Sequence, residues 1–390
     1  MLDIYRVQLD PGHDVGVRLD RVVAAELVAD GVRVGHATGT VVLHAEWLRD
    51  NCPCDGCRIT QTDERRHQPW LGGPPVVATV DLVGGILVVT WRDGHRSVYD
   101  PESFRTIQRA TAREVPGPVP WVSGHNVKRI DHDAVLADSV SRRHLFESFL
   151  RDGAVVLTGA PQRPGAVVDL MAALGIPLRE LSLGRVFDVF VDPAGYNVAY
   201  TAEEIPPHND NAQATHPPSG QVLAMVVNGA AGGDTVLVDG WSVLGRLERD
   251  APEAVDVLAR VAIGFRQYSA EAEGFTRMPI VTRDADGRFT HLRFSNQLRQ
   301  PLPFDHPDVA AWYGAYRALG QLVVDPAHQV RFRLESGQML IVDGRRVLHG
   351  RTAFSPDGRR HLQDVYFDVD DVVGNLARLT GAAQNAMVAR

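Results

Sequence analysis

Short apolar runs alternate with polar and glycine-containing positions through the first hundred residues. This pattern predicts strands at residues 31–34, 40–43, 76–80 and 86–89, separated by turn signals such as Gly84-Gly85. Residues 58–75 are polar and contain prolines and glycines, so we expect a loop there. Residues 88–99 alternate around Asp93-Gly94, a pattern typical of a β-hairpin.

A proline-rich stretch at residues 115–120 breaks this pattern and predicts a linker. Beyond it, helical spacing covers residues 133–150, a buried strand follows at 153–157, and a short helix at 164–174. Further strands are expected at 223–227, 235–239, 338–342, 346–349 and 363–368, with helices at 252–261 and 307–322. We therefore expect an N-terminal domain at residues 1–115 and a second domain at 125–390.

The predicted elements are mainly antiparallel strands with a few covering helices, an α+β composition. They favour a double-stranded β-helix, or jelly roll, over a doubly wound parallel sheet for the second domain. The first domain is expected to be small and rich in β-strands. A chain of 390 residues exceeds what one hydrophobic core usually serves, which agrees with two domains.

Charge and hydropathy exclude several classes of partner. The formal net charge is -8 and no basic block is present, which argues against nucleic acid. The N-terminus has no apolar core of signal-peptide length, and no later run approaches the length of a membrane span. We expect a cytoplasmic protein with no membrane partner.

All three cysteines, Cys52, Cys54 and Cys57, lie within six residues. A tight odd-numbered cluster makes a poor disulfide framework and favours metal binding in a reducing compartment. Three thiolates need a fourth ligand to close a tetrahedral zinc site, and His95 or His67 could supply it. The alternative is a loop of reduced thiols without metal.

His208 and Asp210 stand two residues apart, and His349 follows far downstream. Two ligands from one extended segment and a third from a distant strand form the pattern of a 2-His-1-carboxylate iron site, which leaves one face of the ion open. Solvated side chains in a proline-rich loop are the alternative interpretation of His208 and Asp210.

Several motifs in order resemble the γ-butyrobetaine hydroxylase and trimethyllysine dioxygenase family of TauD/TfdA-like, iron(II)- and 2-oxoglutarate-dependent oxygenases. They cover nearly the whole chain beyond about residue 30, and are residues 48–57, 197–200, 208–210, 232–235, 238–240, 348–351 and 360–362. The family has a zinc module in which a histidine matching His95 is the fourth ligand. It usually has threonine where this chain has Asn209, a change that leaves the ligands intact.

The resemblance implies a dioxygenase that hydroxylates an unactivated C–H bond of a small substrate and releases succinate and carbon dioxide. His208, Asp210 and His349 would hold iron(II), and Arg360 would bind the far carboxylate of 2-oxoglutarate, assisted by Asn197 and Leu223. Molecular oxygen is the other cosubstrate, and ascorbate is the reductant in an assay. Desaturation or cyclisation on the same scaffold stays open, as does a non-catalytic zinc-dependent interaction protein.

The resemblance also implies a betaine-like or amino-acid-like substrate. Tyr200 and Tyr366 match positions of an aromatic cage for trimethylammonium groups, and Phe187 stands where the family has tryptophan. Leu183 and Asn211 replace two tyrosines of the betaine hydroxylases and leave the cage incomplete. Asn296 matches a region that contacts the substrate carboxylate. Core packing is the alternative role of the two tyrosines. Family members commonly form dimers through the N-terminal module, so we expect a homodimer.

Overall fold

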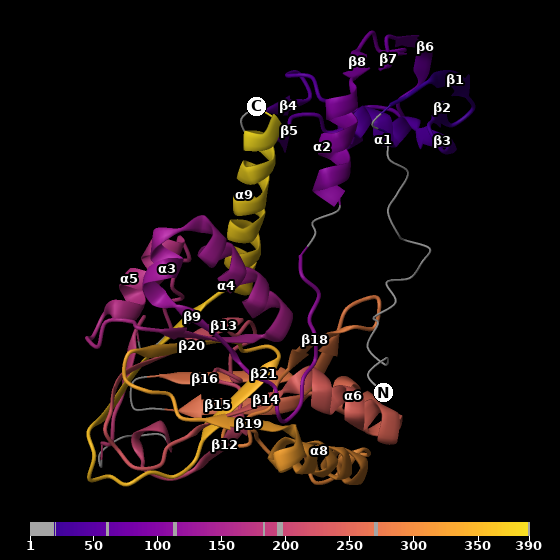
Figure 1. The fold of residues 1–390 in the computed structure, drawn as a ribbon. Coiled ribbons are helices and arrows are strands. Elements are labelled where there is room, and N and C mark those ends of the chain that lie inside the picture. The colour runs from indigo at the N-terminus through magenta and orange to yellow at the C-terminus, as the bar shows by residue number, and fades with distance from the viewer. Residues whose placement is uncertain are drawn as a thin grey trace. The chain divides into compact units, whose positions relative to one another are not determined.

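The computed structural model describes residues 19, 21–59, 62–111, 115–181, 184–192, 198–268 and 272–388, with the backbone alone at 108–111 and 381–388. The chain divides into two compact units, Met1–Glu114 and Val115–Arg390 (Figure 1). Each unit has its own hydrophobic core, and each is described by itself.

The first unit is built from two small antiparallel sheets. One contains β1 (Ala24–Val28), β2 (Gly31–His36) and β3 (Gly39–His44), and the other β6 (Val77–Val83), β7 (Ile86–Trp91) and β8 (Arg96–Tyr99). The helices are α1 (Ala45–Asp50) and α2 (Pro101–Thr111). Buried Leu48, Trp91 and Phe104 belong to the core that these elements share. The hairpin expected around Asp93-Gly94 is the β7–β8 pair.

The second unit contains two larger sheets. The six-stranded sheet has the order β11-β22-β13-β20-β10-β9 and the four-stranded sheet β12-β21-β14-β19. Their bounds are β9 (Lys128–Asp131), β10 (Ala154–Thr158), β11 (Phe187–Val189), β12 (Ile205–His208), β13 (Gly220–Asn228), β14 (Thr235–Asp239), β19 (Gln329–Phe332), β20 (Gln338–Asp343), β21 (Val347–Arg351) and β22 (Arg360–Phe367). Two hairpins, β15 (Ile263–Tyr268) with β16 (Glu273–Met278) and β17 (Val281–Arg283) with β18 (Phe289–Leu292), stand beside them.

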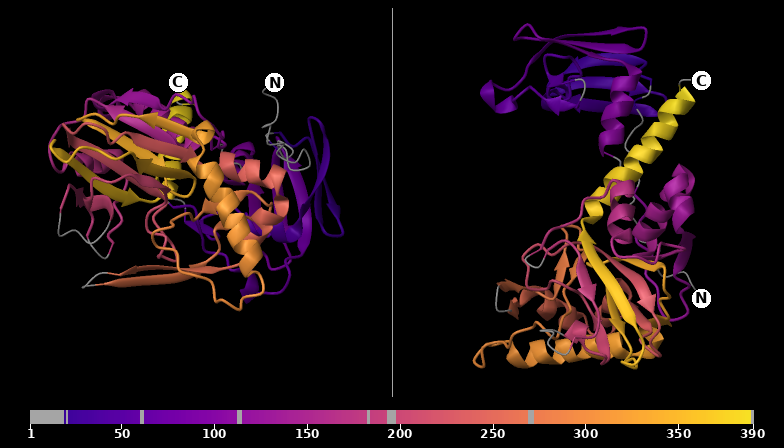
Figure 2. Two further views of the ribbon diagram at one scale, coloured as in Figure 1. Left: turned by 90° about the horizontal axis from the view of Figure 1, so that it is seen from below. Right: turned by 90° about the vertical axis from the view of Figure 1, so that its left-hand side faces the viewer.

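Apolar side chains from both sheets pack against each other in a core that includes Val156, Leu340, Leu237 and Val347. Helices cover the outer face of the six-stranded sheet: α3 (His132–Ala137), α4 (Ser139–Asp152), α5 (Ala166–Leu174) and α9 (Val369–Val388). The outer face of the four-stranded sheet packs on α6 (Gly240–Asp250), α7 (Pro252–Arg260) and α8 (Val309–Val324). The second unit is therefore a stack of helices, sheet, sheet and helices, which Figure 2 shows from two further directions.

Local chemistry explains where the structure departs from the sequence-based elements. The single helix expected at residues 133–150 is two helices, because Asp138 adopts an extended backbone and its side chain accepts a hydrogen bond from the Ser141 amide at the start of α4. The loop expected at 58–75 contains the short pair β4 (Arg58–Ile59) and β5 (Glu64–Arg65) and a 3₁₀ turn, η1 (Pro69–Leu71). Two further 3₁₀ turns are η2 (Val198–Tyr200) and η3 (Pro326–His328).

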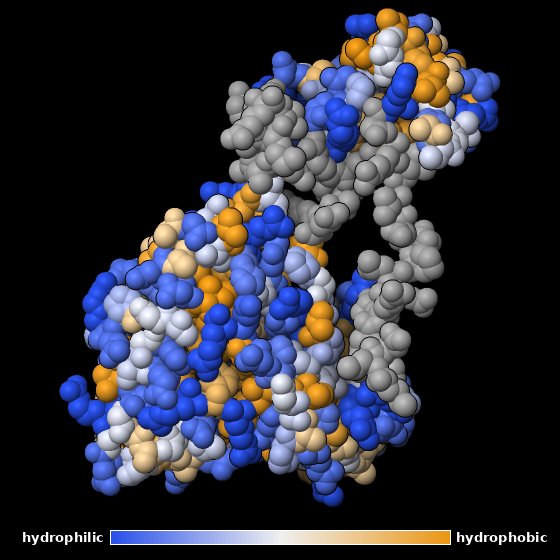
Figure 3. All heavy atoms as spheres, viewed as in Figure 1, coloured by the Kyte–Doolittle hydropathy of each residue, from blue (hydrophilic) through white to orange (hydrophobic). Residues whose placement is uncertain are grey.

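No helix in the described ranges combines the length and the apolar character needed to cross a bilayer. The face of the second unit seen in Figure 3 is mainly polar, with scattered apolar side chains.

A buried ion pair fastens the linker segment to the four-stranded sheet. The Arg346 guanidinium donates to both carboxylate oxygens of Asp239, at 3.0 and 2.7 Å, and both side chains are almost fully buried. Arg346 also donates to the carbonyls of Val119 and Arg151, while Asp239 accepts from the Trp121 amide. These contacts join segments distant in sequence, and Asp239 also caps α6 by accepting from the Trp241 amide.

Replacing Arg346 with methionine should lower the free energy of unfolding by about 3–5 kcal/mol, because the Asp239 carboxylate is left buried without its partner. Denaturant titration of the purified protein measures the change. Arg143→Met is the matched control, since Arg143 pairs with Glu147 on the solvent-exposed side of α4. Equal midpoints for the two variants would contradict the importance of the buried pair.

Candidate active site and metal centres

The three cysteines converge on His95 in the first unit. The Nε2 atom of His95 lies 3.3 Å from the Cys52 sulfur, 3.7 Å from Cys54 and 3.6 Å from Cys57. Ligands of a tetrahedral zinc ion with usual bond lengths stand about 3.6 Å apart, so this donor set fits zinc. His67, the competing candidate, is not part of the cluster.

Arg49 supports this cluster from the side. Its guanidinium donates to the Cys57 sulfur at 3.0 Å and lies 3.6 Å from the Asp93 carboxylate. Three thiolates and one neutral imidazole around a divalent ion leave a net negative charge, which a buried arginine partly compensates. Four protein ligands leave a zinc ion no open position, so the cluster suits a structural role.

Cys54→Ser should release about one zinc ion per chain and lower the thermal unfolding midpoint, because metal binding contributes to the folding free energy of such a site. Metal content after gel filtration and a thermal melt provide the two measurements. His67→Ala is the matched control and should retain zinc. Loss of zinc from His67→Ala but not from His95→Ala would contradict the assignment.

A second cluster of metal-ligand type lies in the second unit. His208 Nε2 stands 3.2 Å from one oxygen of Asp210, and His349 Nε2 stands 3.5 Å from the other. The ligand atoms of the three side chains all lie within 4.8 Å of one another. Neighbouring ligands of an octahedral ion with bonds near 2.1 Å are about 3 Å apart, so one face of such an ion fits these donors.

Strand pairing brings the three side chains together. His208 ends β12 and is the register partner of His349 on β21, which runs between β12 and β14. The strands approach closely because Gly350 has no side chain; a Cβ atom there would collide with the Ile205 carbonyl oxygen. The Nδ1 atom of His208 faces the Pro206 carbonyl at 3.0 Å, and a carbonyl can only accept, so Nδ1 carries the proton and Nε2 is free to bind metal.

Asn209, which separates the two ligands, holds the loop in place. Its side-chain nitrogen donates to the Gly344 carbonyl at 2.6 Å, and its side-chain oxygen accepts from the backbone amide of Phe294 at 2.7 Å. The residue is buried. Asn209 thus positions both neighbouring side chains, a role that the sequence comparison with threonine at this position did not predict.

The ionisation of Asp210 and His349 suits a cation. Burial by itself would lower the pKa of His208, but its hydrogen bond with Asp210 raises it. Burial lowers the pKa of His349 to about 4, so its imidazole is neutral. Burial by itself would raise the pKa of Asp210, but nearby His349 and the hydrogen bonds from His208 and Tyr366 lower it below its usual range. A carboxylate and a neutral imidazole are the forms that bind a divalent metal.

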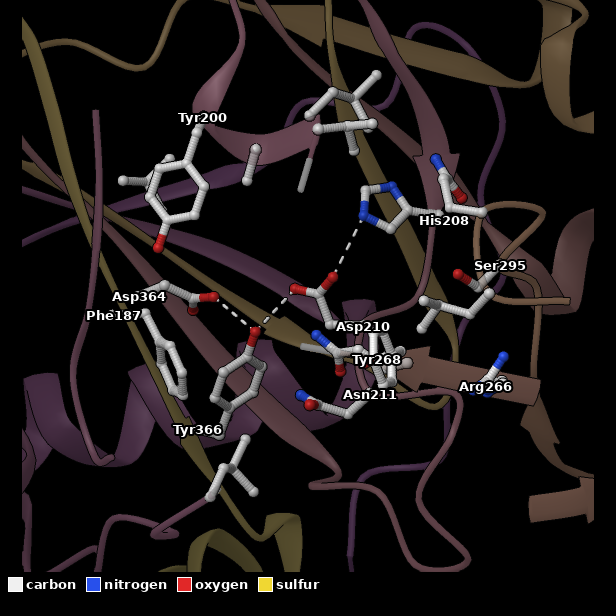
Figure 4. A pocket seen from close by; sticks show the side chains of 18 residues that line it. Phe187, Tyr200, His208, Asp210, Asn211, Arg266, Tyr268, Ser295, Asp364 and Tyr366 are labelled. Atoms are coloured by element: carbon white, nitrogen blue, oxygen red, sulfur yellow. Dashed lines mark hydrogen bonds and ion pairs between the residues drawn. The ribbon is translucent and has the colours of Figure 1, made fainter. Parts of the chain in front are cut away.

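A buried polar network continues from Asp210. The Gln221 amide donates to Asp210 at 2.7 Å and to Asp364 at 2.9 Å. The Tyr366 hydroxyl lies 2.9 Å from Asp210 and 2.6 Å from Asp364 (Figure 4). One hydroxyl proton cannot serve two carboxylates, so a second proton must lie in the network. Burial and the charge of Asp210 raise the pKa of Asp364 well above its usual range, which identifies Asp364 as the group that holds it.

A cavity of about 420 Å³ opens beside these groups. His208, Asp210, Asn211, Tyr200, Phe187, Asp364 and Tyr366 are among its lining residues. The Phe187 and Tyr366 rings meet edge to face, with centroids 5.6 Å apart. The backbone of Asn211 is left-handed, with φ of 56°, a conformation that asparagine tolerates better than most residues.

Asn296 and Leu223, which were also expected at the site, do not line the cavity. Asn296 is exposed, and its side-chain oxygen accepts weak hydrogen bonds from Arg299. Leu223 lies on β13 as the register partner of Asp364 and packs toward the core between the sheets. Asn197 and Leu183 lie outside the described residues.

Arg360 begins β22 and is largely buried among other cations. Burial and the nearby Arg333 lower its pKa to about 10. Its neighbour Arg351 is satisfied by the carbonyls of Val198, Ala199 and Thr201, but the Nε atom of Arg360 has no hydrogen-bond partner among the described residues. The Phe354 ring lies 5.1 Å from its guanidinium carbon. An uncompensated buried arginine of this kind is suited to an anionic ligand.

Comparison with known proteins identifies the family. The model described as Taurine catabolism dioxygenase TauD, TfdA family matches residues 119–366, more than half of the chain. The chain belongs to the TauD/TfdA family. A second model, gamma-butyrobetaine hydroxylase-like, N-terminal, matches residues 30–105 of this TauD/TfdA protein.

The curated relatives of this TauD/TfdA protein include gamma-butyrobetaine dioxygenases and trimethyllysine dioxygenases, the two kinds of enzyme that the sequence resembles. It is 34% identical over 368 residues to gamma-butyrobetaine dioxygenase of Pseudomonas sp. (strain AK-1), which covers 91% of this chain and 95% of the relative. The human gamma-butyrobetaine dioxygenase is 28% identical, covering 87% and 92%. Trimethyllysine dioxygenase of Rattus norvegicus is 27% identical, covering 90% and 86%. The resemblance to this family is confirmed.

Among solved structures, an asparagine oxygenase in complex with Fe(II), 3-hydroxyasparagine and succinate matches with a TM-score of 0.48 and 24% identity, covering 61% of this chain and 83% of the other. The oxygenase OrfP in complex with Fe and alpha-ketoglutaric acid matches with a TM-score of 0.46 and 19% identity, covering 60% and 85%. Similarity at this level assigns no role to any residue of the TauD/TfdA chain.

Proposed function

We propose that this protein is an iron(II)- and 2-oxoglutarate-dependent dioxygenase that hydroxylates an unactivated C–H bond of a small betaine-like or amino-acid-like substrate. Iron(II) with 2-oxoglutarate supplies the oxidant for such a reaction and yields succinate and carbon dioxide. The observation that carries the proposal is the convergence of the ligand atoms of His208, Asp210 and His349 beside a cavity that His208 and Asp210 line.

Each residue of the cluster has a defined task in this proposal. His208, Asp210 and His349 would hold the iron, and three protein ligands would leave it positions for cosubstrate and oxygen. Pro206 fixes the tautomer of His208, and the hydrogen bonds from Gln221 and Tyr366 orient the Asp210 carboxylate. Asn209 holds the segment between the ligands against Phe294 and Gly344.

Arg360 is proposed to bind the far carboxylate of 2-oxoglutarate. The unpartnered Nε and the neighbouring Arg333 and Arg351 create a positive environment that a carboxylate would neutralise. Asn197 and Leu223 are proposed to assist, from the family pattern. Among the described residues, Nε of Arg360 is the atom that lacks a hydrogen-bond partner and could donate to this carboxylate.

Tyr200, Tyr366, Phe187 and Asn211 are proposed to contact the substrate, because all of them line the cavity beside the cluster. Asn296 retains its proposed contact with a substrate carboxylate from the family pattern. A reaction that desaturates or cyclises the substrate would use the same groups, and the mass of the product distinguishes it from hydroxylation.

We further propose that residues 1–115 form a zinc-binding domain with Cys52, Cys54, Cys57 and His95 as ligands, and that residues 125–390 form a jelly-roll oxygenase domain. The Cys3His geometry and the two facing sheets support these assignments. A cytoplasmic homodimer without nucleic-acid or membrane partners is the proposed state of the protein, and light scattering after gel filtration tests the dimer.

His349→Ala should abolish succinate formation while the fold is kept, because it removes one of three protein ligands to the iron. Succinate release with ferrous iron, ascorbate and 2-oxoglutarate measures activity, and circular dichroism checks the fold. His216→Ala, which removes an exposed histidine outside the cavity, is the control. Near wild-type turnover in His349→Ala would reject the ligand assignment.

Arg360→Ala should raise the 2-oxoglutarate requirement by a factor of roughly 30 or more and leave iron binding intact, since a charge-assisted contact worth about 2–5 kcal/mol is lost. Kinetics at varied 2-oxoglutarate and an anaerobic iron titration separate the two effects. Arg359→Ala, at the exposed neighbouring position, should behave as wild type. Unchanged 2-oxoglutarate affinity in Arg360→Ala would exclude this role.

A further inference from the structure

Asp364 is a buried carboxyl group in the wall of the cavity that the iron and cosubstrate roles do not use. It lies on β22, two residues from Tyr366, and only 6% of its surface is exposed. The alternation along the strand turns Asp364 and Tyr366 to the same face, toward the cavity, while Val365 and Phe367 pack under the helices.

The two oxygens of Asp364 have different environments. Oδ2 is engaged by the Tyr366 hydroxyl at 2.6 Å and by the Gln221 amide at 2.9 Å. Oδ1 has no hydrogen-bond partner in the described part of the chain. Leaving a buried acceptor unsatisfied is costly, so such an atom in a ligand cavity indicates that a donor arrives with the ligand.

Asp364 is the acidic group of the cavity lining that can accept a hydrogen bond from a ligand. Asp210, the other acid of the lining, points both oxygens at His208, His349, Gln221 and Tyr366. Arg266, a basic residue of the lining, is already paired with Glu273 at 2.6 Å. In Figure 4 Asp364 lies on the side of the cavity that also holds Phe187, Tyr200 and Tyr366.

We propose that Oδ1 of Asp364 accepts a hydrogen bond from a protonated amine of the substrate, and that the enzyme therefore prefers an ammonium group carrying at least one N–H to a quaternary ammonium. The inference rests on the proposed dioxygenase function and narrows its substrate class to amino-acid-like zwitterions. Asp364 is a specificity-determining residue in this assignment.

The preference follows from what each cation can offer. A trimethylammonium group has no N–H, so it leaves Oδ1 unsatisfied and depends on aromatic faces for binding. The aromatic lining consists of Phe187, Tyr200, Tyr268 and Tyr366, and Asn211 contributes an amide to the cavity beside them. A primary, secondary or protonated tertiary amine gains a charge-assisted hydrogen bond and still packs against Tyr366 and Phe187. Oδ1 accepts this bond whether or not Oδ2 carries a proton.

The test uses straight-chain ω-amino acids of three to six carbons, each with zero, one, two or three N-methyl groups. The dimethylated and trimethylated members of each pair share charge and nearly share size, but only the dimethylated one has an N–H. Substrate-stimulated succinate formation and anaerobic affinity for the iron- and 2-oxoglutarate-loaded enzyme are measured. On the best chain length, the dimethyl compound should bind about tenfold or more tightly than the trimethyl compound.

Asp364→Leu nearly keeps the size of the side chain and removes the acceptor oxygen, so the preference for the N–H compound should fall to less than about threefold. A purely steric exclusion of the third methyl group would leave the preference intact in this variant. Asp188→Leu is the matched control: Asp188 lies on the adjacent strand β11, outside the cavity lining, and its variant should keep the wild-type ratio.

A wild-type preference for the N–H compounds that is lost in Asp364→Leu and kept in Asp188→Leu supports the inference. Equal or tighter binding of the trimethyl compounds by wild type overturns it, while their turnover would uphold the proposed dioxygenase function. If no amine of the panel raises succinate formation above the substrate-free rate, the inference fails, and absence of that basal rate as well would count against the proposed function itself. The wild-type comparison of dimethyl and trimethyl compounds tests the inference even if Asp364→Leu does not fold.

Discussion

The pairing of β12 with β21 is the constraint on which the site depends. His208 and His349 are register partners, and a slip of one residue would turn His349 to the face where Leu348 packs against the helical layer. The small size of Gly350 allows the two backbones to approach, and Asn209 fastens the end of β12 to neighbouring backbone. This register places Asp210 between the two imidazoles. It thereby fixes the carboxylate to which Tyr366 and Gln221 donate hydrogen bonds.

The metal-ligand residues of both clusters could largely be predicted, because most of them lie close together in the sequence. The spacing of His208 and Asp210 needs one extended segment, and the cysteines lie within six residues, so both clusters are visible locally. Strands such as β14 and β20 are continuous apolar runs, which is what two covered faces require. The choice of His95 over His67 was open from spacing alone, and the hairpin that carries His95 to the sulfurs decides it.

The remaining features depend on contacts between distant segments. The partnership of Gln221, Asp364 and Tyr366 requires the register of β13 against β22, which no local pattern specifies. One signal was present: Asp364 interrupts the apolar alternation of Leu362 and Tyr366 at a position that faces inward. The split between α3 and α4 at Asp138 was missed because apolar spacing continues across it, whereas capping depends on the side chain of that single residue. Helices α1, α2, α6 and α9 also lacked a predicted counterpart.

Strand β22 carries Arg360, Asp364 and Tyr366 on one face, because they are separated by even numbers of residues. With a rise near 3.3 Å per residue, the Cα atoms of Arg360 and Asp364 stand about 13 Å apart. The backbone of the strand fixes this separation, whatever the packing of the side chains. Insertion or deletion of one residue in this strand would turn the inward groups on one side of the change outward. Divergence among relatives should therefore proceed here by exchange of single side chains. Changes in length fit better at the β15–β16 hairpin, which pairs as a separate two-stranded sheet. The strand thus keeps the proposed anion-binding residue, Arg360, and the proposed amine acceptor, Asp364, at a constant separation.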